Sequence, residues 1–155
     1  MKPGDQVDDF ALQDETGATR RLSELLQNGP VALFFYPIAS SGGCSQEACH
    51  FRDLAADFAA VGAQPVGISG DAVGKQHAFA STHSLGYPLL SDTGHRVAKA
   101  MGAYRWFLPG GLHTRRITFV IGPDRRIVDT IASETKFDEH ADQALAILRR
   151  AQATA

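Results

Sequence analysis

Cysteine is scarce in this sequence: a chain of 155 residues holds two of them. Two thiols are too few for the disulfide framework that stabilises small secreted domains. Long apolar runs are absent as well, and none approaches the roughly 20 residues that a membrane-spanning helix needs. The N-terminal stretch is polar and acidic, so we expect neither a signal peptide nor a membrane anchor there.

An excess of charge of one sign is also lacking. The chain carries 15 Lys and Arg against 17 Asp and Glu, a net charge of −2. It offers no basic field for nucleic acid and no polybasic patch for a membrane surface. We expect a cytoplasmic protein of one domain, residues 1–155, because no repeat, linker or composition shift divides the chain. We expect a monomer or homodimer without a cofactor, and two cysteines without a second Cys or His pair are too few for zinc.

The spacing of the apolar residues predicts strands that alternate with helices. The expected strands or extended segments are residues 9–14, 18–23, 31–36, 63–69, 87–92 and a hairpin over 116–133 that turns at 122–124. The expected helices are residues 24–27, capped by Ser23, then 44–61, 72–84, 94–102 and 138–150. This order predicts an α/β fold with a mixed central sheet flanked by helices.

Both cysteines lie just after the most apolar of these strands. Cys44 and Cys49 follow residues 31–36, where the carboxyl end of a strand meets the first turn of a helix. Active sites of α/β folds gather at such junctions. The unpaired backbone N–H groups and the positive end of the helix dipole favour the thiolate over the thiol there. The position therefore predicts that Cys44 is a nucleophile.

Neighbouring groups favour this interpretation over two inert, buried cysteines. Ser41 places a hydroxyl three residues before Cys44, and the glycine pair 42–43 lets backbone N–H groups point at an anion. Arg116 precedes the strand "ITFVI", from which it could reach the sulfur. Arg115 is its rival, because strand alternation allows only one of the two arginines to face the site.

Helix geometry separates the two sulfurs. With 3.6 residues per turn, Cys44 and Cys49 lie about 140° apart around the axis, and their Cα atoms are about 8.6 Å apart. That exceeds the limit of ~7 Å for an unstrained disulfide. Cys44 is expected to face the sheet along the stripe of Phe51 and Phe58, with Cys49 roughly opposite. A bond between the sulfurs therefore requires the first turns of the helix to unwind.

Four segments carry a family resemblance: "FYPIASSGGCSQEACHFRD", "GISGDAVGKQHAFA", "YPLLSD" and "RRITFVIGPDRRI". They resemble, in the same order, segments of peroxiredoxins of the bacterioferritin-comigratory, or peroxiredoxin Q, type. The Pro-x-x-x-Thr/Ser-x-x-Cys motif of that family corresponds to Pro37, Ser41 and Cys44. Its arginine, two residues before a Thr-Phe pair, corresponds to Arg116. The resemblance implies a thioredoxin-like fold and thiol-dependent reduction of hydrogen peroxide or organic hydroperoxides.

The resemblance also implies roles for individual residues. Cys44 matches the peroxidatic cysteine, whose thiolate attacks the peroxide and becomes a sulfenic acid. Cys49 matches the resolving cysteine that many members carry five positions later. It would form an intrachain disulfide that thioredoxin or a similar reductant opens. Ser41 and Arg116 would hold the peroxide oxygens and stabilise the departing oxygen, and Pro37 would shield the sulfur from solvent.

The sequence departs from the family near the first cysteine. Many members read Thr-Pro-Gly-Cys where this chain reads Ser-Gly-Gly-Cys at 41–44, which keeps the hydroxyl and frees the loop. Ile38 stands where a lysine is common, which removes a nearby charge. Glu47, one helical turn beyond Cys44, is expected to orient the arginine of the site.

Two other functions compete with a peroxidase. A peroxide-sensing thiol switch or interaction protein would use the same sulfenic acid with little turnover. A general disulfide reductase is disfavoured, because its C-x-x-C motif is absent. The scattered histidines are expected to be mostly solvated, and Trp106 is expected to serve in packing.

Overall fold

Strands alternate with helices in the computed structural model, which describes residues 1–107 and 113–153. The strands are β1 (Ala11–Gln13), β2 (Thr19–Arg21), β3 (Val31–Phe35), β4 (Gln64–Ser69), β5 (Leu89–Ser91), β6 (Ile117–Ile121) and β7 (Ile127–Ala132). The helices are α1 (Leu22–Leu25), the 3₁₀ helix η1 (Leu26–Asn28), α2 (Gly42–Asp53), α3 (Ala55–Ala60), α4 (Val73–His83), α5 (Arg96–Met101) and α6 (Phe137–Ala153).

The seven strands form one mixed sheet in the order β2-β1-β5-β4-β3-β6-β7. Strand β3 pairs in parallel with β4 and antiparallel with β6, so it lies in the interior of the sheet. All five residues of β3 are buried, as its continuous apolar run predicts for a strand covered on both faces. The predicted mixed central sheet is confirmed.

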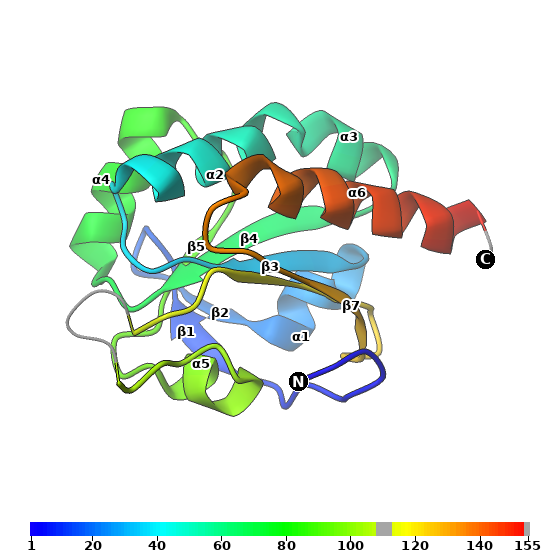
Figure 1. Ribbon diagram of the computed structural model, residues 1–155, viewed down its shortest axis with the longest axis horizontal. Coiled ribbons are helices and arrows are strands. Elements are labelled where there is room, and N and C mark those ends of the chain that lie inside the picture. The colour runs from blue at the N-terminus through cyan, green and yellow to red at the C-terminus, as the bar shows by residue number, and fades with distance from the viewer. Residues whose placement is uncertain (108–112, 154–155) are drawn as a thin grey trace.

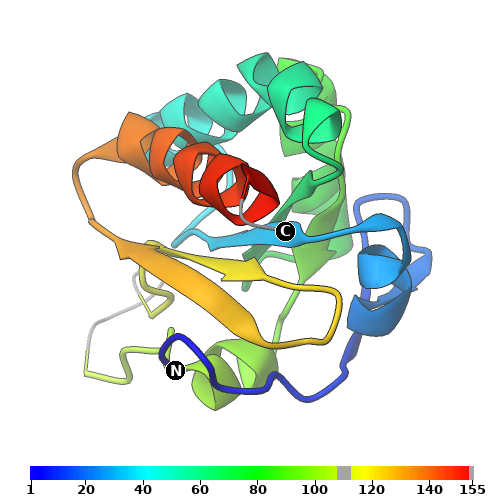
Figure 2. The same cartoon turned by 90° about the vertical axis from the view of Figure 1, so that its right-hand side faces the viewer.

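Helices cover both faces of this sheet (Figures 1 and 2). Helices α2, α3, α4 and α6 lie over one face, and α1 and α5 lie over the other. Alternate residues of β3 serve the two cores because side chains of a strand point to opposite faces. Phe34 stacks on Phe51 of α2, with ring centroids 4.2 Å apart, while Phe35 packs on Phe119 at 5.8 Å in the opposite core.

The predicted helix over 44–61 is two helices. Helix α2 ends at Asp53 and α3 begins at Ala55, because Leu54 between them has φ −96° and ψ 7°, outside helical geometry. The stripe of Phe51 and Phe58 survives the break, and both rings are fully buried. The two short helices therefore still cover the sheet together.

The expected N-cap of the first helix was wrong. Helix α1 begins at Leu22, so Ser23 already lies inside it. Its backbone N–H and its hydroxyl both donate to the carboxylate of Asp9, at 2.9 Å each. A carboxylate from the preceding extended segment thus satisfies the donors that a local cap would serve.

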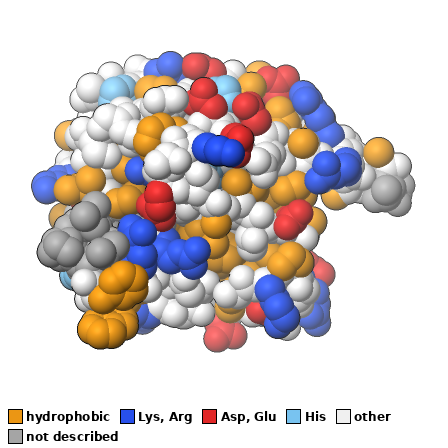
Figure 3. Space-filling model, in the orientation of Figure 1, with side chains coloured by type: hydrophobic (Ala, Val, Ile, Leu, Met, Phe, Trp, Pro, Cys, Tyr) orange, Lys and Arg blue, Asp and Glu red, His pale blue; other side chains and the backbone are white. Residues whose placement is uncertain are grey.

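The face drawn in Figure 3 carries apolar, polar and charged side chains. Lys and Arg side chains occur together with Asp and Glu side chains across the face drawn in Figure 3. Among the described residues, no helix has the length and apolar character needed to cross a membrane.

The expectation that Trp106 serves in packing was wrong. Its side chain is 79% exposed and contacts the ring of Phe107, which is also exposed.

Candidate active site

Cys44 lies in the first turn of α2, after the loop of residues 36–41 that follows β3. Ser41 is the N-cap residue, and its Oγ accepts a hydrogen bond of 3.2 Å from the backbone N–H of Cys44. The Cys44 side chain is 1% exposed and packs in the same core as Phe51. Cys49 is half-buried on the same helix, and both thiols are free. The predicted orientation of Cys44 toward the sheet is confirmed.

The loop that leads into α2 is anchored by Asp71, which the sequence did not single out. Its Oδ2 accepts hydrogen bonds from the backbone N–H of Ala39, at 2.7 Å, and from the hydroxyl of Ser69, at 2.6 Å. Ser40 has φ +70°, a left-handed conformation that is uncommon for serine. The buried carboxylate thus holds the loop in the sharp turn that starts the helix.

Arg116 places a cation beside the sulfur. Its Nη2 lies 3.4 Å from Sγ of Cys44, and its Nη1 donates to Oε1 of Glu47 at 2.9 Å. The guanidinium carbon is 4.7 Å from the ring centre of Phe137, close enough for a cation–π contact. Burial lowers the pKa of Arg116, but its attraction to Cys44 and Glu47 and its hydrogen bonds to them outweigh burial and shift the pKa upward. The guanidinium therefore stays charged.

Strand alternation separates the two arginines that compete in the sequence. Arg116 lies in phase with Thr118, which faces the core beneath α6 and bonds to a residue of that helix. Nη1 of Arg115 instead donates to the carbonyl of Gly102, at the end of α5 on the other face. The structure thus brings Cys44, Arg116 and Glu47 together and leaves Arg115 outside.

Glu47 is a wholly buried carboxyl group beside this cation. Burial raises the pKa of Glu47 to about 8, and the attraction of Arg116 only partly opposes that shift. At neutral pH, Oε1 therefore belongs to an uncharged acid that accepts from the guanidinium. The contact expected between Glu47 and the arginine of the site is present.

One glycine of the loop is required by close packing. A Cβ added at Gly43 would lie 2.6 Å from the Phe137 ring, whereas one added at Gly42 would meet no atom within 4 Å. Pro37 is half-buried just after β3. Its predicted shielding of the sulfur stays a prediction.

His140 is a site neighbour that the sequence grouped with the solvated histidines. Its side chain is fully buried, with Nδ1 2.8 Å from Oγ1 of Thr118 and Nε2 2.9 Å from the carbonyl oxygen of Ser133. Residues 140, 144 and 148 form one buried stripe of α6. That helical spacing was the signal that could have identified His140 as buried.

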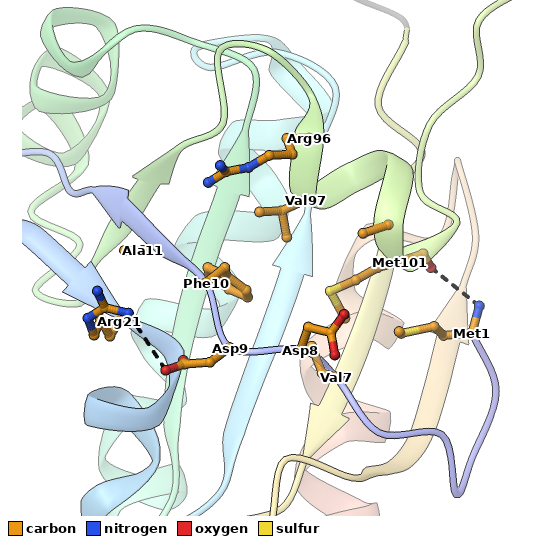
Figure 4. A pocket seen from close by; sticks show the side chains of 11 residues that line it. Met1, Val7, Asp8, Asp9, Phe10, Ala11, Arg21, Arg96, Val97 and Met101 are labelled. Carbon is orange, nitrogen blue, oxygen red and sulfur yellow. Dashed lines mark hydrogen bonds and ion pairs between the residues drawn. The ribbon is translucent and has the colours of Figure 1, made fainter.

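A separate pocket of about 480 Å³ lies on the α5 side of the sheet (Figure 4). Val7, Phe10 and Met101 line its apolar part, and an ion pair of 3.8 Å between Arg21 and Asp9 lies at its edge. None of the residues that line it belongs to α2, β6 or α6.

Among the described residues, no group of three His, Cys, Asp or Glu side chains could hold a metal ion.

Comparisons with known proteins agree on one family. The AhpC/TSA family matches residues 3–130. A crystal structure of peroxidoxin BcpB from Mycobacterium tuberculosis shares 55% of the sequence, with a TM-score of 0.93 over 97% of both chains. A mutant of PrxQ from Xylella fastidiosa shares 28%, with a TM-score of 0.88 over 97% of both chains. The chain is also 35% identical over 154 residues to the chloroplastic peroxiredoxin Q of Arabidopsis thaliana, covering 97% of this chain and 68% of that protein.

The fold, the family match and the similar structures define the class of this protein: it is a peroxiredoxin with a thioredoxin-like fold, as its motifs indicate. The chain belongs to the AhpC/TSA family, which matches most of its length. The relatives described above are peroxiredoxins of the bacterioferritin-comigratory, or peroxiredoxin Q, type. This membership supports a thiol peroxidase with a peroxide as substrate and a thiol as reductant.

Proposed function

We propose that this protein reduces hydrogen peroxide and organic hydroperoxides through Cys44. The observation that carries the proposal is the 3.4 Å contact between Nη2 of Arg116 and Sγ of Cys44, on a sulfur that is 1% exposed. Where water is largely excluded, a cation at this distance stabilises negative charge far more than it does in bulk water. The same cation serves the charge that develops on the departing oxygen.

The first chemical step oxidises Cys44. Its thiolate attacks one oxygen of the peroxide, and the O–O bond breaks with its electron pair on the other oxygen. Cys44 becomes a sulfenic acid, and the departing hydroxide or alkoxide takes up a proton and leaves as water or alcohol. Arg116 holds the departing oxygen. Ser41 accepts from the helix with its oxygen and can donate its hydroxyl proton to the peroxide, while Pro37 shields the sulfur.

The second step forms a disulfide with Cys49. The thiol of Cys49 condenses with the sulfenic acid of Cys44, an S–S bond forms, and water leaves. Both residues lie in α2, and α2 must unwind at its start because a regular helix holds their Cα atoms too far apart. Thioredoxin or a similar dithiol then reduces the disulfide. A chain with two cysteines suits a reducing compartment, so we place this cycle in the cytoplasm. We propose that it runs on a single-domain monomer or homodimer.

A coupled assay with thioredoxin, thioredoxin reductase and NADPH tests this proposal. We expect continuous NADPH oxidation on addition of peroxide, and no oxidation above background with Cys44→Ser. A single stoichiometric oxidation without turnover would instead support a peroxide-sensing switch. Turnover by the Cys44→Ser variant would refute the assignment of the nucleophile.

A further inference from the structure

Glu47 and His140 lie beside Arg116 in a fully buried cluster. Oε1 of Glu47 accepts from Nη1 of Arg116, but Oε2 of Glu47 has no hydrogen-bond partner among the described residues. Nδ1 of His140 lies 3.5 Å from that Oε2. Both side chains are 0% exposed, so water does not reach the gap between them freely. Buried polar atoms without a partner are rare and call for an explanation.

The hydrogen bonds of His140 determine which nitrogen faces Glu47 and what it can do there. Nε2 lies 2.9 Å from the carbonyl oxygen of Ser133, which can only accept, so Nε2 carries a proton. In a neutral imidazole, Nδ1 is then an acceptor with one lone pair, to which either the hydroxyl of Thr118, at 2.8 Å, or a protonated Oε2 of Glu47 can donate. Oε2 and Nδ1 are therefore two acceptors facing each other, unless one of them carries a proton.

We propose that Glu47 and His140 share one proton beside Arg116, and that this proton keeps the charge of Arg116 available to the Cys44 sulfur. With the proton, the pair is neutral whichever atom carries it. Without the proton, the pair adds one negative charge next to the guanidinium. That charge disfavours the thiolate and the departing anion together. The inference deepens the proposed peroxidase function, and His140 acts in it as a positioning residue.

The carboxyl group is the member of the pair that holds the proton at neutral pH. Burial raises the pKa of Glu47 to about 8, and burial also lowers the pKa of His140. The proton is therefore lost from Glu47 as the pH rises through about 8. The charged and titratable groups that act on the pair are Arg116 before β6, Glu134 in the loop before α6, Glu139 on α6, and Tyr87, while Cys44 on α2 acts on Arg116.

The pH profile of a single oxidation tests the role of Glu47. The reduced protein is mixed with one equivalent of hydrogen peroxide, and the rate constant of peroxide loss is measured from neutral to alkaline pH. We expect the rate constant of the wild type to fall as the pH rises through about 8. In Glu47→Gln the amide still accepts from Arg116 but has no acid proton to lose, so the alkaline fall should disappear. A Glu47→Gln variant that keeps the same fall would overturn the proposal.

A change at His140 tests the partner. Glutamine can donate from its amide nitrogen to the carbonyl of Ser133, but its amide oxygen is a weaker base than a ring nitrogen, so the shared proton leaves more easily. We therefore expect His140→Gln to move the alkaline fall to lower pH. His77→Gln, at an exposed histidine of α4, is the matched control and should leave the profile unchanged. A folded His140→Gln variant with the wild-type profile would contradict the role of His140.

Infrared spectroscopy detects the proton on Glu47 without an activity measurement. It therefore tests the proposal even if the His140→Gln variant does not fold. The wild type at neutral pH should show the C=O band of a buried, protonated carboxyl group that Glu47→Gln lacks, and the band should vanish as the pH passes about 8. Absence of this band at neutral pH would overturn the proposal. The two ideas fail separately: turnover by Cys44→Ser refutes the peroxidase cycle, whereas the infrared band does not depend on Cys44.

Discussion

Replacing Arg116 with alanine is expected to slow the attack of Cys44 on peroxide by about 10²- to 10³-fold, the usual cost of removing one donor from a developing oxyanion. Arg116 is 6% exposed, and its guanidinium lies 3.4 Å from the sulfur. Without rearrangement, no water molecule can therefore take its place and stabilise the negative charge equally well. Ionisation of the thiol explains only part of that loss. An ordinary thiol with a pKa near 8.5 is roughly 7% ionised near pH 7.4, so full ionisation gains about fourteenfold at most. The remainder must come from stabilisation of the departing oxygen.

The assay measures two quantities in the same variant. Stopped-flow oxidation by one equivalent of peroxide gives the rate constant, and the ultraviolet absorbance of the thiolate gives the ionised fraction of Cys44 across pH. Arg115→Ala is the control, because that side chain donates to Gly102 on the opposite face and should leave both quantities unchanged. If Arg116→Ala lost no more rate than its loss of thiolate accounts for, the arginine would only favour ionisation and our reasoning would be refuted.

Three further predictions concern the helix start, the recycling step and the core. Gly43→Ala should slow peroxide oxidation, because its new methyl group would lie 2.6 Å from the ring beneath the site arginine, while Gly42→Ala should not; equal rates would contradict the packing argument. Cys49→Ser should block thioredoxin-linked turnover yet leave one rapid oxidation of Cys44, as mass spectrometry would record, and undiminished turnover would indicate an external resolving thiol. Phe34→Ala should lower the free energy of unfolding in urea by about 3–5 kcal/mol, because it removes a buried ring, and a loss below ~1 kcal/mol would contradict the tight core.

The elements that the sequence predicts best are those whose signal is local. The continuous apolar run at Val31–Phe35 predicts a doubly covered strand, and every residue of β3 is buried. The alternation of residues along β6 predicts that one of two adjacent arginines faces the sulfur, and Arg116 does. The break at Leu54 has no comparable signal, since neither Gly nor Pro interrupts the helical spacing there.

The parts that the sequence could not predict depend on contacts between distant segments. Asp9 takes the capping role expected of Ser23 because the fold brings the extended N-terminal segment to the start of α1. The pairing of Glu47 with His140 joins α2 to α6. These helices are far apart in the sequence: His50 and Asp142, which also form a contact between them, are separated by 92 residues. A helical stripe identifies a buried histidine, but only the packed structure shows which carboxyl group it faces.

The central claim is that Cys44 is the reactive sulfur, and intact-mass analysis of a time course with one equivalent of peroxide tests it most directly. We expect one oxygen to be added at Cys44 far faster than to free cysteine, and a disulfide with Cys49 then to form with loss of water. Oxidation of Cys44 at the rate of free cysteine, or first oxidation at Cys49, would contradict that claim.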